Sequence, residues 1–229
     1  MRSVTLGKVD DRTPTTEKGV RPLFPGTRQE RKQRTRQALL QAALDLLEDR
    51  SFGSLSLREV ARGAGIVPTA FYRHFGSMEE LGLALIDESF RALRHMLRDA
   101  RSGQRGYEHV IRSSLEVLVR HVHERRQHFR FIARQRGSGV AALRHAIRAE
   151  IRLIGSELAT DLARFPAMSG WSGEDLRMMA GLIVNAMVST IEELLDAPAE
   201  SAEAEEQIIG TAERQLRLIA LGVPAWRSR

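Results

Sequence analysis

Apolar residues recur at every third or fourth position along most of this chain, and that spacing predicts helices separated by short breaks. In the stretch from 140 to 165, Val140, Leu143, Ile147 and Ile151 fall on one helical face. The other ranges with helical periodicity are 28–49, 56–63, 68–75, 77–102, 107–125, 128–136, 172–196 and 201–221. No stretch convincingly predicts a strand. We therefore expect an all-α fold of about nine helices.

One of these predicted helices, 172–196, is apolar nearly all round, as Met179, Ile183 and Met187 illustrate. Such a helix has to be buried on more than one side. One side can pack in the core of its own subunit and the other against a second subunit. The two C-terminal helices are therefore expected to form a homodimer interface.

The segment 51–81, SFGSLSLREVARGAGIVPTAFYRHFGSMEEL, predicts two short helices joined by a glycine turn. Ser56 and Glu59 have the Ser-x-x-Glu spacing of a capping box, in which each side chain accepts a hydrogen bond from the other residue's backbone amide. Gly63-Ala64-Gly65 follows, where a glycine can take the positive φ of a sharp turn. This order of elements is typical of a DNA-binding helix-turn-helix.

The second helix of the pair has two chemically different faces. Pro68 suits its first position, while Phe71 and Phe75 share the face expected to pack on the core. The other face carries hydroxyl, phenol and guanidinium groups that suit the major groove. Residues of three elements are expected to contact DNA: this second helix, the N-cap of the first helix of the pair, and the basic helix before them. They are Arg31, Arg34, Arg36, Ser56, Thr69, Ala70, Tyr72, Arg73 and His74. The alternative is an ordinary pair of capped helices in a bundle.

The capped helix, the Ala-Gly-Ile turn and the ending Phe-Tyr-x-His-Phe resemble the TetR family of bacterial regulators, from about Thr27 to the C-terminus. The resemblance implies a homodimeric repressor of palindromic operator DNA. Within the family, SFGSLSLREVARGAGIVPTAFYRHF, LGLALIDES and FRFIARQRGSG are similar to the unsaturated fatty acid repressors FabR and DesT. Val67 and Met78 differ from many relatives, which carry a capping serine and a phosphate-binding lysine there.

The expected organisation has three parts. Residues 1–26 hold three prolines and no helical periodicity, which predicts a flexible N-terminal arm. Residues 27–76 are the expected helix-turn-helix DNA-binding domain, and residues 77–229 the expected ligand-binding and dimerisation domain.

The charge balance favours a polyanionic partner, because the net charge is +6 and the isoelectric point is about 10.6. The charge is unevenly distributed. Residues 1–36 hold ten Lys and Arg against four Asp and Glu, whereas residues 192–206 hold seven acids and no base. Basic charge is therefore concentrated at the end of the chain that is predicted to bind DNA.

Other features of the composition exclude several classes. The absence of cysteine excludes disulfides, thiolate zinc sites and cysteine nucleophiles. No run of about eighteen apolar residues predicts a membrane span, and the N-terminus lacks the apolar segment of a secretory signal. We expect a cytoplasmic protein with no membrane partner and no cofactor.

The resemblance also implies a small hydrophobic effector, most simply long-chain acyl-CoA, in control of fatty acid or lipid metabolism genes. Fifteen buried methylenes would supply roughly 12 kcal/mol as an upper bound, and the coenzyme's phosphates need cations. The candidate effector-binding residues are aromatic or cationic: Phe90, Arg91, Arg94, Arg98, Phe129, Arg130, Arg134 and Arg136. The alternative for the stripe of three arginines between 91 and 98 is a solvated helix face.

Catalytic and metal sites are not expected. His121 and His123 are two residues apart and point away from each other on a helix, so with Glu124 and His128 they make a poor metal site. No Ser/His/acid set falls on elements that would bring it together, so an enzyme is not expected. Two other functions stay open: a TetR-type sensor of drugs or other xenobiotic ligands, and an acyl-CoA carrier with a vestigial DNA-binding head.

Overall fold

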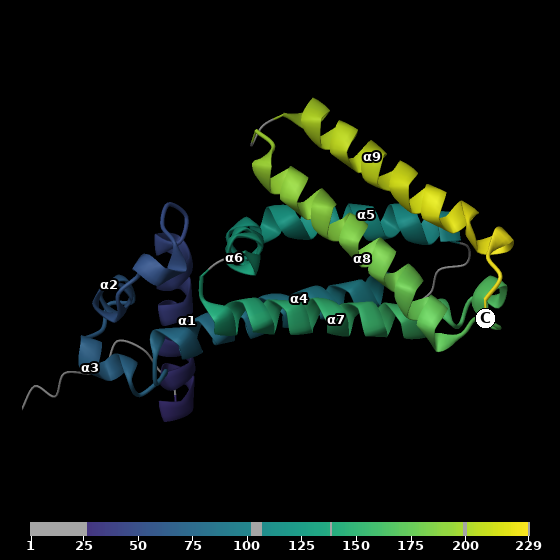
Figure 1. Cartoon of the computed structure of the whole chain (residues 1–229). Coiled ribbons are helices and arrows are strands. Elements are labelled where there is room, and N and C mark those ends of the chain that lie inside the picture. The colour runs from purple at the N-terminus through teal and green to yellow at the C-terminus, as the bar shows by residue number, and fades with distance from the viewer. Residues whose placement is uncertain (1–26, 102–106, 138, 199–200, 229) are drawn as a thin grey trace, which may run out of the picture.

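The computed structural model describes residues 27–101, 107–137, 139–198 and 201–228, except the side chains of 96, 98–101 and 107–110. This part of the chain forms nine α-helices and no strand (Figure 1). The helices are α1 Arg28–Leu46, α2 Leu57–Gly63, α3 Pro68–Phe71, α4 Met78–Arg101, α5 Tyr107–Glu124, α6 Arg126–Arg136, α7 Ala141–Leu162, α8 Gly173–Asp196 and α9 Ala202–Leu221. There are also three single 3-10 turns: η1 Phe52–Ser54 between α1 and α2, η2 Pro166–Met168 between α7 and α8, and η3 Val223–Ala225 after α9.

The prediction of an all-α fold with about nine helices is confirmed. The largest difference lies in the second helix of the predicted pair. α3 ends at Phe71, and Arg73 and His74 then make i to i+3 hydrogen bonds, such as His74 N to Phe71 O at 2.8 Å, before Phe75 N makes one i to i+4 bond to Phe71 O at 3.1 Å. The i to i+3 bonds wind the backbone more tightly than an α-helix and seldom extend far, which explains the short element.

Side-chain caps explain where several helices begin. Thr27 and Glu30 form a complete capping box at the start of α1, which the sequence analysis did not identify. Ser172 and Ser201 accept hydrogen bonds from first-turn amides of α8 and α9. Each cap satisfies a donor that would otherwise have no partner within its helix, and so fixes the first residue of the helix.

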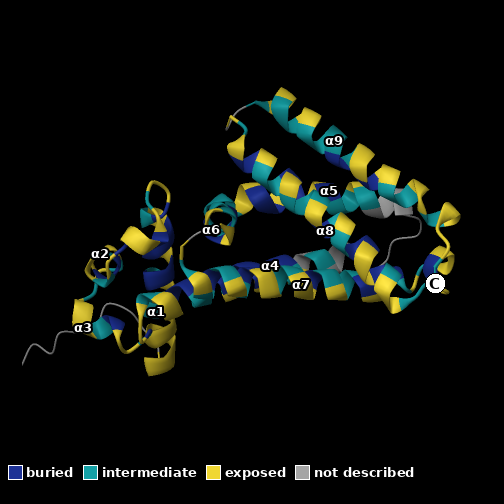
Figure 2. Cartoon of the chain, in the orientation of Figure 1, coloured by how far each residue is buried: buried dark blue, intermediate teal, exposed yellow. Residues whose placement is uncertain are grey.

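The molecule consists of a head, α1 to α3, and a body, α4 to α9 (Figure 1). In the body, α4 and α7 lie side by side, α8 runs obliquely from the far end of α7 across α5, and α9 is the outermost helix. Buried residues line the inward faces of the helices (Figure 2). One apolar cluster runs without a break from Leu39 in α1 through Leu85 in α4 to Leu195 in α8. Head and body therefore share a core.

α8 is apolar on nearly all sides because it packs against α5, α7 and α9. By length and composition alone it would also be long and apolar enough to cross a membrane. A single helix of this kind is weak support for a span, since core helices of soluble proteins pass the same test. Polar residues interrupt the apolar run in α8, whereas the average hydropathy of the helix is high.

The far end of the body has a small apolar cluster of its own. It includes Met168 and Leu176, and the rings of Trp171 and Trp226 lie beside it with centroids 6.5 Å apart. The Ser228 hydroxyl donates to Asp175 at 2.5 Å and holds the C-terminal segment against this end. Figure 1 shows that this cluster and the head lie at opposite ends of the molecule.

The joint between head and body contains an aromatic plug. Phe52 of η1 is buried, and its ring centroid lies 6.0 Å from that of Phe131 in α6. The ring also lies against Gly82 in α4, where an added Cβ would meet Phe52 Cζ at 2.6 Å and Leu143 Cδ2 at 3.0 Å. Only a glycine leaves room for this ring, so Gly82 is a packing requirement of the joint.

Replacing Gly82 by alanine should therefore lower the free energy of unfolding. Overpacking in a closed core costs about 1–3 kcal/mol, and the higher helix propensity of alanine offsets about 1 kcal/mol of it. The control is Gly155→Ala in α7, where no atom lies within 4 Å of the added Cβ, and this change should stabilise. Urea unfolding of both variants measures the difference. Equal stabilisation by both changes would mean that Phe52 does not occupy this position.

Candidate nucleic-acid interface

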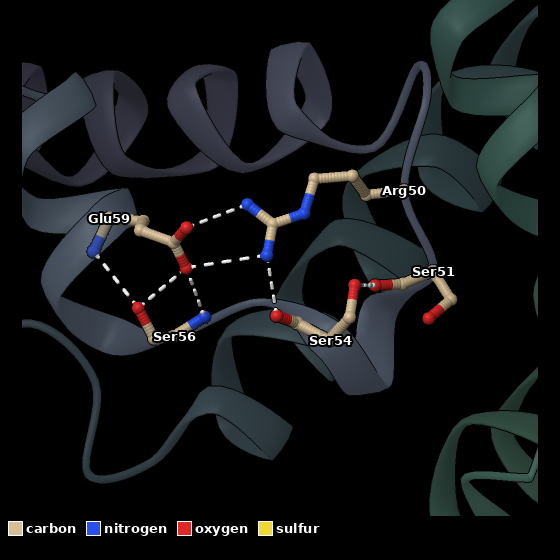
Figure 3. Close-up of polar contacts among 5 residues, drawn as sticks. All are labelled: Arg50, Ser51, Ser54, Ser56 and Glu59. Atoms are coloured by element: carbon tan, nitrogen blue, oxygen red, sulfur yellow. Dashed lines mark hydrogen bonds and ion pairs between the residues drawn. The ribbon is translucent and has the colours of Figure 1, made fainter.

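The first helix of the pair, α2, begins and ends as its sequence predicts. Ser56 Oγ accepts from Glu59 N at 3.3 Å, and the Glu59 carboxylate accepts from Ser56 N at 3.0 Å, so the predicted capping box is present (Figure 3). After α2, Gly65 has a φ of 70°, the one positive φ in the described part of the chain. Ile66 N then donates to Ala61 O at 2.9 Å and closes the turn.

Arg50 fixes the position of this cap. Its guanidinium contacts Glu59 at 2.7 Å and donates to Ser54 O at 2.7 Å, which joins the α1–α2 connection to the start of α2 (Figure 3). The hydrogen bonds from Arg50 and then from Ser56 lower the pKa of Glu59 to about 2. The sequence analysis did not identify Arg50, because the two residues are nine positions apart across a loop and no local spacing rule pairs them.

The recognition segment, residues 68–75, presents the outward face that its periodicity predicts. Phe71 and Phe75 are buried, with ring centroids 5.7 Å apart. Tyr72 is 64% exposed, and Thr69 and Arg73 are exposed beside it. The two buried phenylalanine rings therefore support an exposed hydroxyl, phenol and guanidinium. Each of these groups can bond to the edges of DNA bases or to phosphates.

Two other residues expected to touch DNA have restricted roles. The Ser56 hydroxyl donates to the Glu59 carboxylate at 2.6 Å, so it is already committed within the cap. Ala70 is half-buried and can offer only a methyl contact. Val67, at the N-cap of α3, forms no side-chain cap, as its apolar side chain predicts.

The basic residues of α1 fall into two groups. Arg31 and Arg34 are exposed in the first half of the helix. Arg36 instead stacks on the ring of Phe75, with its Cζ 4.3 Å from the centroid, and donates to His74 O at 3.2 Å. The guanidinium of Arg36 thus holds the recognition segment against α1, a role that its sequence position did not reveal.

The surroundings of His74 favour its neutral imidazole. Burial lowers the pKa of its imidazole, and the nearby charges of Lys32, Arg36 and Arg73 lower it further. Its Nδ1 is buried with no hydrogen-bond partner among the described residues. An unpaired ring nitrogen of this kind can form a hydrogen bond with a phosphate.

The candidate effector-binding residues do not form a single cluster. Phe90 and Phe129 are buried in the shared core, and Arg130 is half-buried on α6. The hydrogen-bond and ion-pair partners of the arginines lie on different elements: Arg91 with Asp87 in α4, Arg94 with Glu150 in α7, Arg136 with Glu192 in α8, and Arg134 with backbone carbonyls that follow α1. The side chain of Arg98 is outside the described residues.

The interior of the body holds polar groups that the sequence analysis missed. Gln135 in α6 is 3% exposed, and its Oε1 has no hydrogen-bond partner in the described structure. His121 in α5 is buried, and its Nε2 is also without a partner there. Gln135 lies four residues after Phe131 on the same helical face, and that spacing on an apolar face was the available signal. Unpaired buried polar groups are costly, so both atoms are places where a ligand could bond.

Two open depressions flank the α5–α6 corner. One, of about 460 Å³, lies against Gln41 of α1 and is lined by residues 123–128. The other, of about 380 Å³, lies between α5 and the α8–α9 connection, beside Leu194 and Ile209. In the first, burial and then Arg125 and His121 lower the pKa of His128 to about 4, so this ring is neutral. No three His, Cys, Asp or Glu side chains converge on a metal-sized space within the described ranges.

Two family models match the chain. The model described as bacterial regulatory proteins, tetR family, matches residues 39–85, which include α2, the turn and α3. The model described as the tetracyclin repressor-like C-terminal domain matches residues 107–214, from α5 into α9. Together they cover more than half of the 229 residues.

Solved structures share the fold at low sequence identity. The regulator SCO4454 from Streptomyces coelicolor, a TetR-family protein, has a TM-score of 0.67 and 17% identity over 84% of this chain and 97% of its own. The fatty acid degradation regulator FadR from Bacillus halodurans has a TM-score of 0.66 and 12% identity, covering 85% and 97%. AibR, solved with isovaleryl coenzyme A and operator DNA, has a TM-score of 0.60 and 13% identity, covering 83% and 98%.

The capping cluster in Figure 3 makes the stability of the head depend on pH. Because folding lowers the pKa of Glu59 from 4.5 to about 2, its contribution is fully present above pH 4.5 and is lost as the pH falls toward 2. Glu59→Gln keeps a capping side chain but loses the charge facing Arg50. This variant should melt a few degrees below wild type at pH 7, and the gap should narrow by pH 3.

The matched control is Glu116→Gln, which removes one charge from an exposed site on α5. Thermal unfolding followed by circular dichroism at pH 7, 5 and 3 measures both variants. A gap for Glu59→Gln that stays constant across this range would show that the carboxylate is not stabilised by Arg50.

Proposed function

Since this chain belongs to the TetR family of bacterial transcriptional regulators, which are DNA-binding transcription factors and not enzymes, we propose that it is a repressor of palindromic operator DNA. It acts as a homodimer in the cytoplasm. Residues 27–76 are its DNA-binding domain, residues 77–229 its ligand-binding and dimerisation domain, and residues 1–26 a flexible arm.

The observation that carries this proposal is the outward face of the recognition segment. Thr69 and Arg73 are exposed, and in this proposal they reach base edges in the major groove. Tyr72, Arg31 and Arg34 are exposed, and in this proposal they bond phosphates that position the head. His74 can add a neutral contact, and Arg36 supports the segment from behind.

Dimerisation is supported by apolar side chains exposed on α8 and α9. Met178 and Leu182 on α8 are 45% and 52% exposed, and Leu218 and Leu221 on α9 are 72% and 71% exposed. Large apolar residues gathered on two adjacent helices are typical of a buried interface. A twofold contact through these helices gives each subunit the same patch, as a palindromic operator requires.

The proposed effector is a small hydrophobic molecule, with long-chain acyl-CoA the first candidate and fatty acid or lipid genes the targets. The FabR and DesT resemblance and the acyl-CoA complex of AibR support it, as do the core aromatics Phe90 and Phe129 and the unpaired Gln135 Oε1. The chain would have to enter a packed core, so binding must favour a second conformation of the body. The phosphates would compete with partners such as Glu150 for Arg94.

Two alternatives lead to different outcomes. The same fold can sense drugs or other xenobiotics, in which case acyl-CoA would not bind. An acyl-CoA carrier with a vestigial head would bind the ligand and select no operator.

Arg73→Ala should weaken binding to the operator and relax sequence preference at one position of each half-site. Loss of a good base contact costs about 1–3 kcal/mol, or about five- to 150-fold in affinity for each half-site. Arg34→Ala should weaken binding to all sequences alike and lower the salt dependence by about one phosphate contact. Operator selection followed by fluorescence anisotropy measures both, with Arg152→Ala on the exposed face of α7 as control. A wild-type protein that enriches no palindrome would contradict the repressor proposal.

An acyl-CoA thioester should bind the purified dimer and change its operator affinity. Native mass spectrometry of gently purified protein, and anisotropy titrations with palmitoyl-CoA, oleoyl-CoA and free coenzyme A, test this. Free coenzyme A should have little effect, because the apolar chain supplies most of the binding free energy. No binding of either thioester would favour the xenobiotic alternative.

A further inference from the structure

Head and body meet through a polar cluster in addition to the Phe52 plug. We call it the clasp: Gln41, Asp45, Glu48 and the carbonyls of Leu47 and Glu48 on the head side, and Gln127 and Arg134 of α6 on the body side. Figure 1 shows α6 beside the end of α1 that is away from the start of that helix, while α3 lies on the far side of the head.

Arg134 supplies a positive charge at the C-terminal end of α1, where that helix has none of its own. α1 has no basic residue in its last turn, and its C-cap is Leu47 instead of a glycine. Arg134 Nη1 donates to Leu47 O at 2.7 Å and to Glu48 O at 2.8 Å, so the body places a cation at the negative end of the α1 dipole. These carbonyls would otherwise have no protein donor from their own helix.

Gln127 both accepts and donates hydrogen bonds at the same end of α1. Its Oε1 accepts from Gln41 Nε2 at 3.1 Å, and its Nε2 donates to Glu48 Oε1 at 2.6 Å and to Asp45 Oδ1 at 3.3 Å. A side chain that both donates and accepts has only one good orientation here. The clasp therefore resists sliding of α6 along α1 as well as separation of the two helices.

The clasp contributes little to folding of the head itself. The core of the head is made of buried residues such as Leu39, Val60, Phe71 and Phe75, none of which belongs to the clasp. Arg134 is exposed, so water can replace it at the carbonyls of α1. Removing the clasp should leave a folded head that can tilt on α4 and on the Phe52 plug.

We propose that Arg134 and Gln127 are positioning residues that fix the tilt of the head and thereby restrict the operator to one spacing between half-sites. The inference rests on the proposed function, since it assumes two heads on one duplex. One base pair more or less moves a half-site by about 3.4 Å and about a tenth of a turn, which a rigid pair of heads cannot follow. A pair of heads without the clasp can.

The test uses full-length protein and duplexes that carry the selected half-sites with the spacer lengthened or shortened by one base pair. Wild type should prefer one spacer strongly. In Arg134→Gln combined with Gln127→Ala that preference should fall about tenfold, the scale expected from one or two net hydrogen bonds. Binding to a duplex with a single half-site should stay within about twofold of wild type, because no base contact is removed.

Two further variants distinguish a change in the tilt of the head from a loss of its folding. Arg134→Lys keeps a cationic donor for the α1 carbonyls and should restore much of the spacer preference. Arg148→Gln, which removes an exposed charge of α7, should keep the wild-type preference. An unchanged spacer preference in the double variant overturns the inference, and so does loss of single half-site binding, since the clasp would then serve to fold the head. If wild type selects no operator at all, the proposed function itself fails.

Discussion

The contact between the Phe52 ring and the bare backbone of Gly82 is the constraint from which the rest of the arrangement follows. It brings the α1–α2 connection of the head against α4, α6 and α7 of the body at one point. Because α4 also continues directly from the recognition segment, the head is joined to the body by its chain and by this ring, in addition to the clasp. The apolar cluster that results is continuous, so head and body cannot be treated as two modules on a flexible tether.

The arginines of this basic chain fall into two groups, those exposed for contact with DNA and those bonded to other groups of the protein. Arg31, Arg34 and Arg73 are exposed toward any polyanion, whereas Arg36, Arg50 and Arg134 are committed to a ring, a carboxylate and backbone carbonyls. Net charge therefore overstates the cations available to DNA. Burial, and then the positive charges of Lys32, Arg36 and Arg73, lower the pKa of His74.

Local rules were sufficient to predict the helices, the Ser56 capping box, the turn that Gly65 makes with positive φ, and the outward orientation of Tyr72. Each depends on residues within one or two turns of each other. The Glu59 partner of Arg50 lies nine positions away, and the His74 partner of Arg36 and the Leu47 partner of Arg134 lie 38 and 87 positions away, so no spacing rule specifies them. The length of α3 was also overestimated, because helical periodicity does not distinguish an α-helix from successive tighter turns. The likeness to FabR and DesT was not confirmed by the comparisons.

The two tryptophans of this chain lie together at the end of the body opposite the head. Intrinsic fluorescence excited at the indole band will consequently report the packing of that end, around Trp171 and Trp226, and will scarcely register what the DNA-reading end does. Optical study of head movement requires a reporter placed there, whereas the native emission already provides an internal standard for the integrity of the rest.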